Sequence, residues 1–226
     1  MKDIFIRIYM GVSGVLILVL SFLVYNLYDQ EIIRTKGIIV EDEHGRDRIL
    51  IGAPIPESKD RVRTDLKKVE EYWAGQYGEQ YMEWYKDYYH GTNGMVVMDE
   101  HGIDKLLVGD KLADANGGVR ISESTGIIWN DENGMERGGV GVDKLKENNQ
   151  YRGTLGFDDN TGAEGFHLAQ FEDGSQLLRM VYQDGYLLFG QAKPNSFLQN
   201  QEPFIGIVVF DKDDNIVFKK NFIEKE

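Results

Sequence analysis

The tetrapeptide Asp-Glu-His-Gly occurs twice in the chain, at 42–45 and at 99–102, and its residue types could do chemistry. Carboxylates beside an imidazole can hold a metal ion or exchange protons with a substrate. Two copies would then form a duplicated site. A third copy at 131–134 has Asn133 in place of the histidine, so a metal or catalytic interpretation requires one degenerate copy.

A β-hairpin explains the same residues without that difficulty. Each copy lies between runs rich in Ile, Val and Leu, which favour strands. Aspartate can accept backbone N–H groups two residues on, and glycine can adopt the positive φ that closes a turn. The sixteen-residue units 37–52 and 94–109 share nine identical positions. A basic residue follows the turn in three copies, where we expect it to pair with the acid before the turn: Arg48, Lys105 and Arg137. Weaker copies with acidic turns lie at 155–169, 168–182 and 206–220.

Other catalytic and metal-binding patterns are weak in this sequence. The absence of cysteine excludes disulfides, thiolate zinc sites and cysteine nucleophiles. No local motif indicates a Ser-His-Asp triad. Two acidic stretches have the oxygen-rich composition of calcium sites but lack the spacing of a calcium-binding loop. We therefore predict neither a metal site nor a cofactor, and keep structural calcium as a third hypothesis for these residues: Asp158, Asp159, Asn160, Asp211, Asp213 and Asn215.

The segment Asp60–His90 interrupts the strand pattern and is predicted to be helical. Its apolar and aromatic residues recur every three or four positions, as on one face of a helix. The aromatic residues are too many for one buried stripe, and aromatic side chains are enriched at binding interfaces. The alternative is that both faces are covered. The candidate binding residues are Trp73, Tyr77, Tyr81 and Trp84.

The segment Ile8–Tyr28 is 21 residues long and uncharged, which is the length and composition of a transmembrane helix. Large residues stand where a signal peptide would have its small-residue cleavage site, so we expect an uncleaved anchor. Lys2 and Arg7 precede the segment, whereas Arg34 and Lys36 lie farther from its end. This bias places the N-terminus in the cytoplasm and the body outside it.

The net charge of −13 makes the protein an unsuitable partner for nucleic acid. We predict a mainly β fold with two parts: a membrane anchor and juxtamembrane linker at 1–36, and a β-hairpin-repeat domain at 37–226 with a helical insertion at 60–90. The hairpins should form an antiparallel meander that curls into a barrel-like or sandwich sheet.

The hairpin copies, the stretch Ile49–Pro56 and the stretch Gly126–Gly139 resemble a loose group of uncharacterised bacterial single-pass membrane-anchored proteins with repeated Asp-Glu-x-Gly hairpins. The resemblance extends from Thr35 to about Tyr182. It implies the same architecture and a bacterial source, and it implies no catalytic residues.

Two functions from different classes follow. The first is a membrane-anchored binding or scaffolding module of the bacterial cell envelope with no catalytic site, which contacts an envelope protein or glycan through the aromatic helix. The alternative is an envelope hydrolase acting on glycans, which uses an acidic pair beside stacked aromatic residues. That alternative predicts a concave pocket with two carboxylates about 5–10 Å apart.

Overall fold

The computed structural model describes residues 2–28, 34–72, 79–87, 90–112, 122–146, 148–196, 198 and 202–223. The chain divides into two compact units, 1–36 and 37–226. Of the four candidate binding residues, Trp73 and Tyr77 lie outside the described residues, and the side chain of Trp84 is likewise not described.

The first unit contains helix α1 (Lys2–Tyr28), whose described apolar side chains are exposed almost throughout. Its most apolar window has a mean hydropathy of 2.3, so the helix is long and apolar enough to cross a membrane, as an anchor or as a signal sequence. The helix starts six residues before the predicted uncharged segment Ile8–Tyr28, because Lys2, Asp3 and Arg7 also fit the helical backbone.

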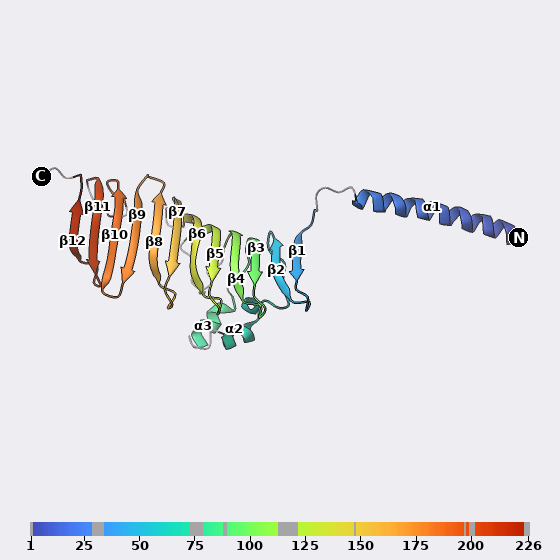
Figure 1. Ribbon diagram of the computed structural model, residues 1–226, viewed down its shortest axis with the longest axis horizontal. Helices are drawn as coiled ribbons and strands as arrows, with labels where there is room; N and C mark the ends of the chain where they lie inside the picture. The colour runs from blue at the N-terminus through green and yellow to red at the C-terminus, as the bar shows by residue number, and fades with distance from the viewer. Residues whose placement is uncertain are drawn as a thin grey trace. The chain divides into compact units, whose positions relative to one another are not determined.

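The second unit is one antiparallel sheet of 12 strands in strict sequence order, which confirms the predicted meander (Figure 1). The strands are β1 (Gly37–Glu41), β2 (Asp47–Gly52), β3 (Asn93–Met98), β4 (Asp104–Asp110), β5 (Ser122–Asn130), β6 (Glu136–Leu145), β7 (Tyr151–Asp158), β8 (Glu164–Phe171), β9 (Gln176–Tyr182), β10 (Gly185–Ala192), β11 (Phe204–Asp211) and β12 (Ile216–Asn221).

The sheet is open, so the predicted closure into a barrel or folding into a sandwich does not occur. A barrel requires strands that are staggered along the sheet. Here the cross-strand partners of Gly37 form a row through Gly126 and Gly206 to Asn221, and this one row crosses all 12 strands. Because no stagger accumulates, β1 and β12 remain at opposite edges.

The row that begins at Gly37 also explains why the repeated unit is sixteen residues long. The first and last residues of each sixteen-residue unit are glycines that pair with each other across one hairpin, as Gly94 does with Gly109. Both adopt positive φ, and a Cβ on Gly94 would lie 2.0 Å from the backbone oxygen of Val108. The neighbouring strands therefore approach too closely for a side chain at this point.

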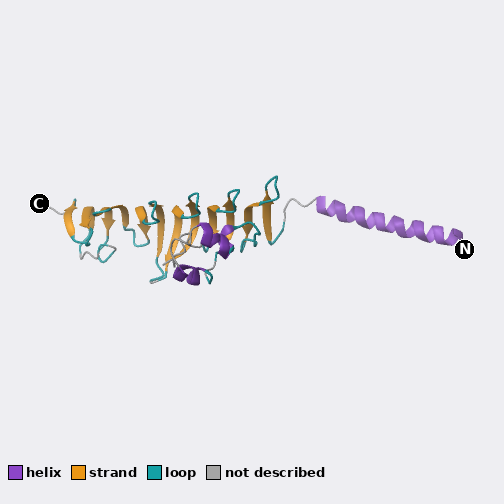
Figure 2. Ribbon diagram, turned by 90° about the horizontal axis from the view of Figure 1, so that it is seen from below, coloured by secondary structure: helices purple, strands orange, loops and turns teal. Residues whose placement is uncertain are grey.

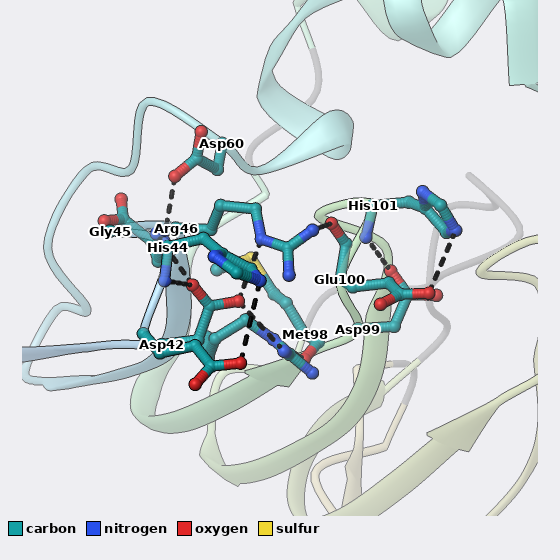
Figure 3. Close-up of polar contacts among 12 residues, drawn as sticks. Asp42, His44, Gly45, Arg46, Asp60, Met98, Asp99, Glu100 and His101 are labelled. Atoms are coloured by element: carbon teal, nitrogen blue, oxygen red, sulfur yellow. Dashed lines mark hydrogen bonds and ion pairs between the residues drawn. The ribbon is translucent and has the colours of Figure 1, made fainter.

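Five turns between strands share one geometry, which confirms the predicted turn. In each, one carboxylate oxygen of the first residue accepts the N–H groups of the second and fourth residues after it. In the first turn, Asp42 accepts from His44 at 2.9 Å and from Arg46 at 3.2 Å, and Gly45 has φ +72° (Figure 3). The turn aspartates are Asp42, Asp99, Asp131, Asp159 and Asp211.

The insertion between β2 and β3 is helical, as predicted, but the described part consists of short helices instead of one long helix. They are η1 (Val62–Thr64), α2 (Leu66–Tyr72) and α3 (Glu79–Tyr85). Asp65 begins α2 by accepting the N–H groups of Lys67 and Lys68. Figure 2 shows α2 and α3 on one side of the sheet.

The hydrophobic core lies on that same face of the sheet, which we call the covered face. One cluster joins Leu50, Val96, Leu107 and Ile128 of β2–β5 to residues of the connecting loops, such as Ile55. A second cluster packs the insertion against the turns: Val62, Val69, Tyr85, Ile103 and Met135. A third, around Phe204 and Val208, lies on β10 and β11.

Candidate functional site

The two histidines of the repeat lie at the turn tips, pointing away from the core, with 65% and 62% of the side chains of His44 and His101 exposed. The imidazole Nε2 atoms of His44 and His101 lie 3.7 Å and 3.6 Å from the carboxylate of the adjacent glutamate. Within the described ranges, no group of three or more metal-ligating side chains is close enough to hold an ion. The geometry of Asp-Glu-His-Gly is that of a turn.

The basic residue after each of the first three turns pairs with the turn aspartate, as predicted. The distances to the carboxylate are 3.3 Å for Arg48, 3.7 Å for Lys105 and 2.5 Å for Arg137. The structure adds a contact that the sequence did not indicate, because each of these bases also donates to a backbone oxygen of the next hairpin. The acceptors are the carbonyl groups of Met98, Asp131 and Asp159.

Tyr81 is the candidate binding residue whose side chain the structure describes. It is half-buried against the cluster of Val62 and Val69, and its ring centroid lies 5.7 Å from that of Tyr85. This packing matches the alternative that the aromatic stripe is core. Tyr81 and Tyr85 are four residues apart in α3, so both lie on one face of the helix.

Behind this aromatic pair lies a buried charged cluster that sequence reasoning missed. Arg61 donates from two nitrogens to the carboxylate of Asp104, at 2.9 Å and 2.7 Å, and Arg63 Nε lies 3.2 Å from the same carboxylate. All three side chains are at most 4% exposed. Burial raises the pKa of Asp104, but the two guanidinium groups outweigh it and hold that pKa below its usual value.

The cluster borders a cavity of 670 Å³ at the insertion, which is lined by Arg61, Arg63, Tyr85, His90 and residues of the loop 54–58. His90 stacks on Tyr85 with ring centroids 4.3 Å apart. Burial, together with the nearby Arg63 and Arg61, lowers the pKa of His90 to about 3, so this imidazole is neutral at physiological pH. No sequence motif marks the site, because β4 and the insertion contribute its charges from positions 43 residues apart.

A smaller groove of 260 Å³ lies over β5–β8 on the covered face. Glycines along its floor leave room, and Asp143 binds both Ser124, at 2.8 Å, and Arg152, at 3.1 Å. Glu164 also lines the groove, and burial raises the pKa of its carboxyl group. Burial and Arg152 lower the pKa of the neighbouring His167 to about 4. None of the described residues that line the groove is Phe, Tyr or Trp, so the predicted combination of acidic pair and stacked aromatic side chain is not assembled here.

The other face of the sheet, which we call the bare face, carries two apolar rows that cross all the strands. The described helices and core clusters lie on the opposite side, and no residue of the first row is buried. The first row is Ile38, Ile51, Met95, Val108, Ile127, Val140, Leu155, Leu168, Leu178, Phe189, Ile207 and Lys220. The second row is Val40, Ile49, Val97, Leu106, Trp129, Gly138, Phe157, Phe166, Met180, Leu187, Val209 and Phe218.

A more polar row borders these two on the side away from the aspartate turns. Its members are Asn93, Asp110, Thr125, Val142, Gly153, Gln170, Gln176, Gln191 and Ile205, of which six are polar. An apolar centre with a polar border is the composition of a protein–protein interface. Periodicity alone could not reveal this surface, because alternation along a strand predicts an apolar face but not whether another layer covers it.

Comparison of the chain with protein-family models, with curated proteins and with solved structures found no match.

Proposed function

We propose that the protein is a non-enzymatic, membrane-anchored scaffolding module of the bacterial cell envelope, whose bare face binds a second copy of the same chain. The observation that carries this proposal is the pair of apolar rows across the sheet, with no described element packed on them. Contiguous apolar surfaces of this extent on a folded domain mark interaction sites.

A second sheet is the natural cover for an amphipathic sheet. An apolar sheet face is stable when it packs against another layer, and two sheets pack face to face about 10 Å apart. One chain supplies only one layer here, so two copies would complete the sandwich that a single copy does not form. A two-fold axis would bring the same rows of both copies together.

The area of the two apolar rows is large enough for the interface of a stable dimer. The 12 strands, about 4.8 Å apart, span about 53 Å, and two rows of side chains cover about 14 Å along the strands. Each copy therefore presents roughly 700 Å², and a pair would bury roughly 1,400 Å², within the usual range of about 1,200–2,000 Å².

The net charge of the chain and its anchoring through α1 both favour binding of the bare face to a second copy over binding of that face to lipid. The net charge of −13 opposes contact of the sheet with an anionic bilayer surface. Anchoring through α1 would hold two bodies beside the same membrane and raise their effective concentration. The positive charges of Lys2 and Arg7 before the apolar segment support a body on the outer side.

The aromatic insertion provides a second candidate surface for an envelope protein or glycan, with Trp73, Tyr77, Tyr81 and Trp84 as its proposed contacts. Replacing Tyr81 and Trp84 together by Ala should weaken capture of a co-purifying partner from the native envelope. If folding and every co-purifying partner stay unchanged in this double variant, the insertion is not a binding surface.

The test of the bare face compares two neighbouring residues on opposite faces. Met180 lies in the second apolar row and is 43% exposed, whereas Val181 is 38% exposed and points to the other side. We expect the full chain in detergent micelles to be dimeric by light scattering. Met180→Lys should weaken the dimer at least about tenfold, which corresponds to about 1.4 kcal/mol, and Val181→Lys should not. A monomeric wild type, or equal effects of the two substitutions, would refute the proposal.

One observation favours the alternative of a glycan hydrolase. The groove over β5–β8 holds Glu164, whose raised pKa suits a proton donor, together with Asp143. This alternative is supported less well, because the described lining offers no aromatic platform for a sugar. It predicts release of reducing ends from peptidoglycan or envelope polysaccharide, lost at least about 100-fold in Glu164→Gln. Equal release by wild type and this variant would exclude it.

A further inference from the structure

Three aromatic side chains form a continuous group at the middle of the bare face. Trp129, Phe157 and Phe166 lie in the second apolar row, on β5, β7 and β8. The ring centroids are 5.6 Å apart between Trp129 and Phe157, and 5.7 Å apart between Phe157 and Phe166. Because the 12 strands follow sequence order, the middle of the sheet lies between β6 and β7, inside this group (Figure 1). Aromatic residues near the centre of an interface often supply much of its binding energy.

The second row lacks a side chain next to an exposed ring of this group. Gly138 on β6 separates Trp129 from Phe157. A Cβ on Gly138 would lie 2.8 Å from Cζ2 of Trp129, so the indole extends over the glycine. The side chain of Phe157, by contrast, is 46% exposed. The middle of the bare face therefore has a low position at Gly138 directly beside a protruding ring.

A two-fold axis parallel to the strands would bring these two features together. In a face-to-face pair, such an axis between β6 and β7 lays β6 of one copy over β7 of its partner, and β5 over β8. It preserves each position along the strands, so the second row faces the second row. Gly138 then lies opposite the partner's Phe157, and Trp129 lies opposite the partner's Phe166. Because the same patch is used on both copies, each contact occurs twice.

A two-fold axis along the rows, midway between them, would fit the same residues less well. It would place every strand over its own counterpart and set the second row against the first. Phe157 would then face the partner's Leu155, and Gly138 would face the partner's Val140. That arrangement opposes two large side chains, whereas an axis parallel to the strands opposes a large side chain and a glycine. Facing layers pack densely when large and small positions alternate.

We propose that two copies of the chain pair through their bare faces about an axis parallel to the strands, with Phe157 of each copy seated on Gly138 and Trp129 of the other. This inference rests on the proposed function, because it specifies how the bare face recognises a second copy. Burial of the exposed ring against the indole removes apolar surface from water and adds aromatic contacts at the centre of the interface.

The chain has no cysteine, so introduced cysteines can report the arrangement by cross-linking. The full chain in detergent micelles is treated with a bis-maleimide that spans about 10 Å, the separation of packed sheets. Leu155→Cys on β7 is displaced from its own counterpart by one strand, about 5 Å, and should cross-link to itself. Val108→Cys on β4 is displaced from its counterpart by five strands, about 24 Å, and should not. It should instead link to Leu178→Cys on β9 of the partner when the two variants are co-expressed.

The outcomes separate failure of this arrangement from failure of the dimer. Cross-linking of Val108→Cys to itself without a mixed product would indicate the axis along the rows and would overturn the proposed arrangement, while the dimer stands. A dimer by light scattering in which Leu155→Cys does not cross-link would overturn the arrangement as well. A monomeric wild type, with no cross-linked product in any variant, would refute the proposed function and this inference together.

The same substitution at the middle and at the edge of the second row tests the role of Phe157. Phe157 and Phe218 are 46% and 52% exposed, and Phe218 lies on the edge strand β12. We expect Phe157→Ala to weaken the dimer at least about tenfold and Phe218→Ala less than about threefold. Circular dichroism checks that both variants are folded before the dissociation constants of the dimers are compared. Equal weakening by the two substitutions would refute the seating of Phe157 at the centre.

Discussion

Arg137 and Asp131 form an ion pair of 2.5 Å within the third hairpin, and the same guanidinium donates to the carbonyl group of Asp159 in the fourth. Asp131 in turn accepts the N–H groups of Asn133 and Met135 with its other oxygen. One aspartate therefore organises its own turn and holds the base that reaches the next turn. Arg48 and Lys105 repeat this relation in the hairpins before it.

Replacement of Asp131 by Ala should destabilise the body by about 1–3 kcal/mol, because it leaves turn N–H groups without their acceptor and removes the partner of Arg137. Urea unfolding of the full chain in micelles, followed by tryptophan fluorescence, measures the change in free energy of unfolding. The matched control is Glu132→Ala, which alters the exposed neighbour in the same turn and should change stability by less than about 0.5 kcal/mol. Equal effects would show that the carboxylate of Asp131 contributes nothing specific.

The close approach of the strands at the row of glycines predicts a larger loss of stability when a side chain is added there. Gly126 faces Gly141 across β5 and β6, and a Cβ on Gly126 would lie 2.1 Å from the backbone oxygen of Val140. Gly126→Ala must therefore displace a strand and should cost on the order of 3 kcal/mol or more. Gly153→Ala in β7 is the control, because its Cβ would meet nothing closer than 4.0 Å. A similar free energy of unfolding for both variants would contradict the close approach of the strands.

The turns and hairpins of this fold could be predicted from the sequence, because they are formed by contacts between residues that lie close together in the chain. The Asp-x-x-Gly turns, the paired bases Arg48, Lys105 and Arg137, and the meander follow from short-range hydrogen bonds and neighbouring hairpins. The helical insertion was predicted in place, although Asp65 and the apolar spacing could not fix where its short helices begin and end.

Long-range features escaped prediction. Whether the meander closes depends on stagger accumulated over 12 strands, which no single hairpin encodes. The cluster of Arg61, Arg63 and Asp104 depends on how the insertion packs against β4, since these residues share no motif. The bare face likewise becomes visible only when the register aligns Ile127 with Val140 and Leu155 in one row.

The histidines of the repeat should be dispensable. His44 and His101 contribute backbone N–H groups to the turns, and their exposed rings lie beside the adjacent glutamates. Replacing both by Asn, the residue at the same point of the third turn, should leave the melting temperature within about 1 °C of wild type. Zinc and EDTA should not shift it in either protein. A zinc-dependent rise that disappears in the double variant would restore the metal interpretation.

The stability of the body should decrease in mild acid because of two imidazoles. Burial lowers the folded pKa of His90 to about 3 and that of His167 to about 4, from an unfolded value near 6.5. Between these values the unfolded chain binds the extra protons, so stability is full above pH 6.5 and falls as the pH decreases toward 4. Each group contributes a slope of at most about 1.4 kcal/mol per pH unit.

His167→Gln isolates one of these contributions. It removes the titrating group that burial and Arg152 keep neutral, so the loss of unfolding free energy between pH 6.5 and 4 should become shallower than in wild type. His101→Gln, which changes an exposed imidazole at a turn tip, should leave the slope as it is. The carboxylate of Asp104 cannot produce the same signal, because its folded pKa is lowered from an already acidic value and its contribution is lost only below about pH 4. A wild-type stability that stays constant from pH 6.5 to 4 would show that neither histidine is held neutral by the fold.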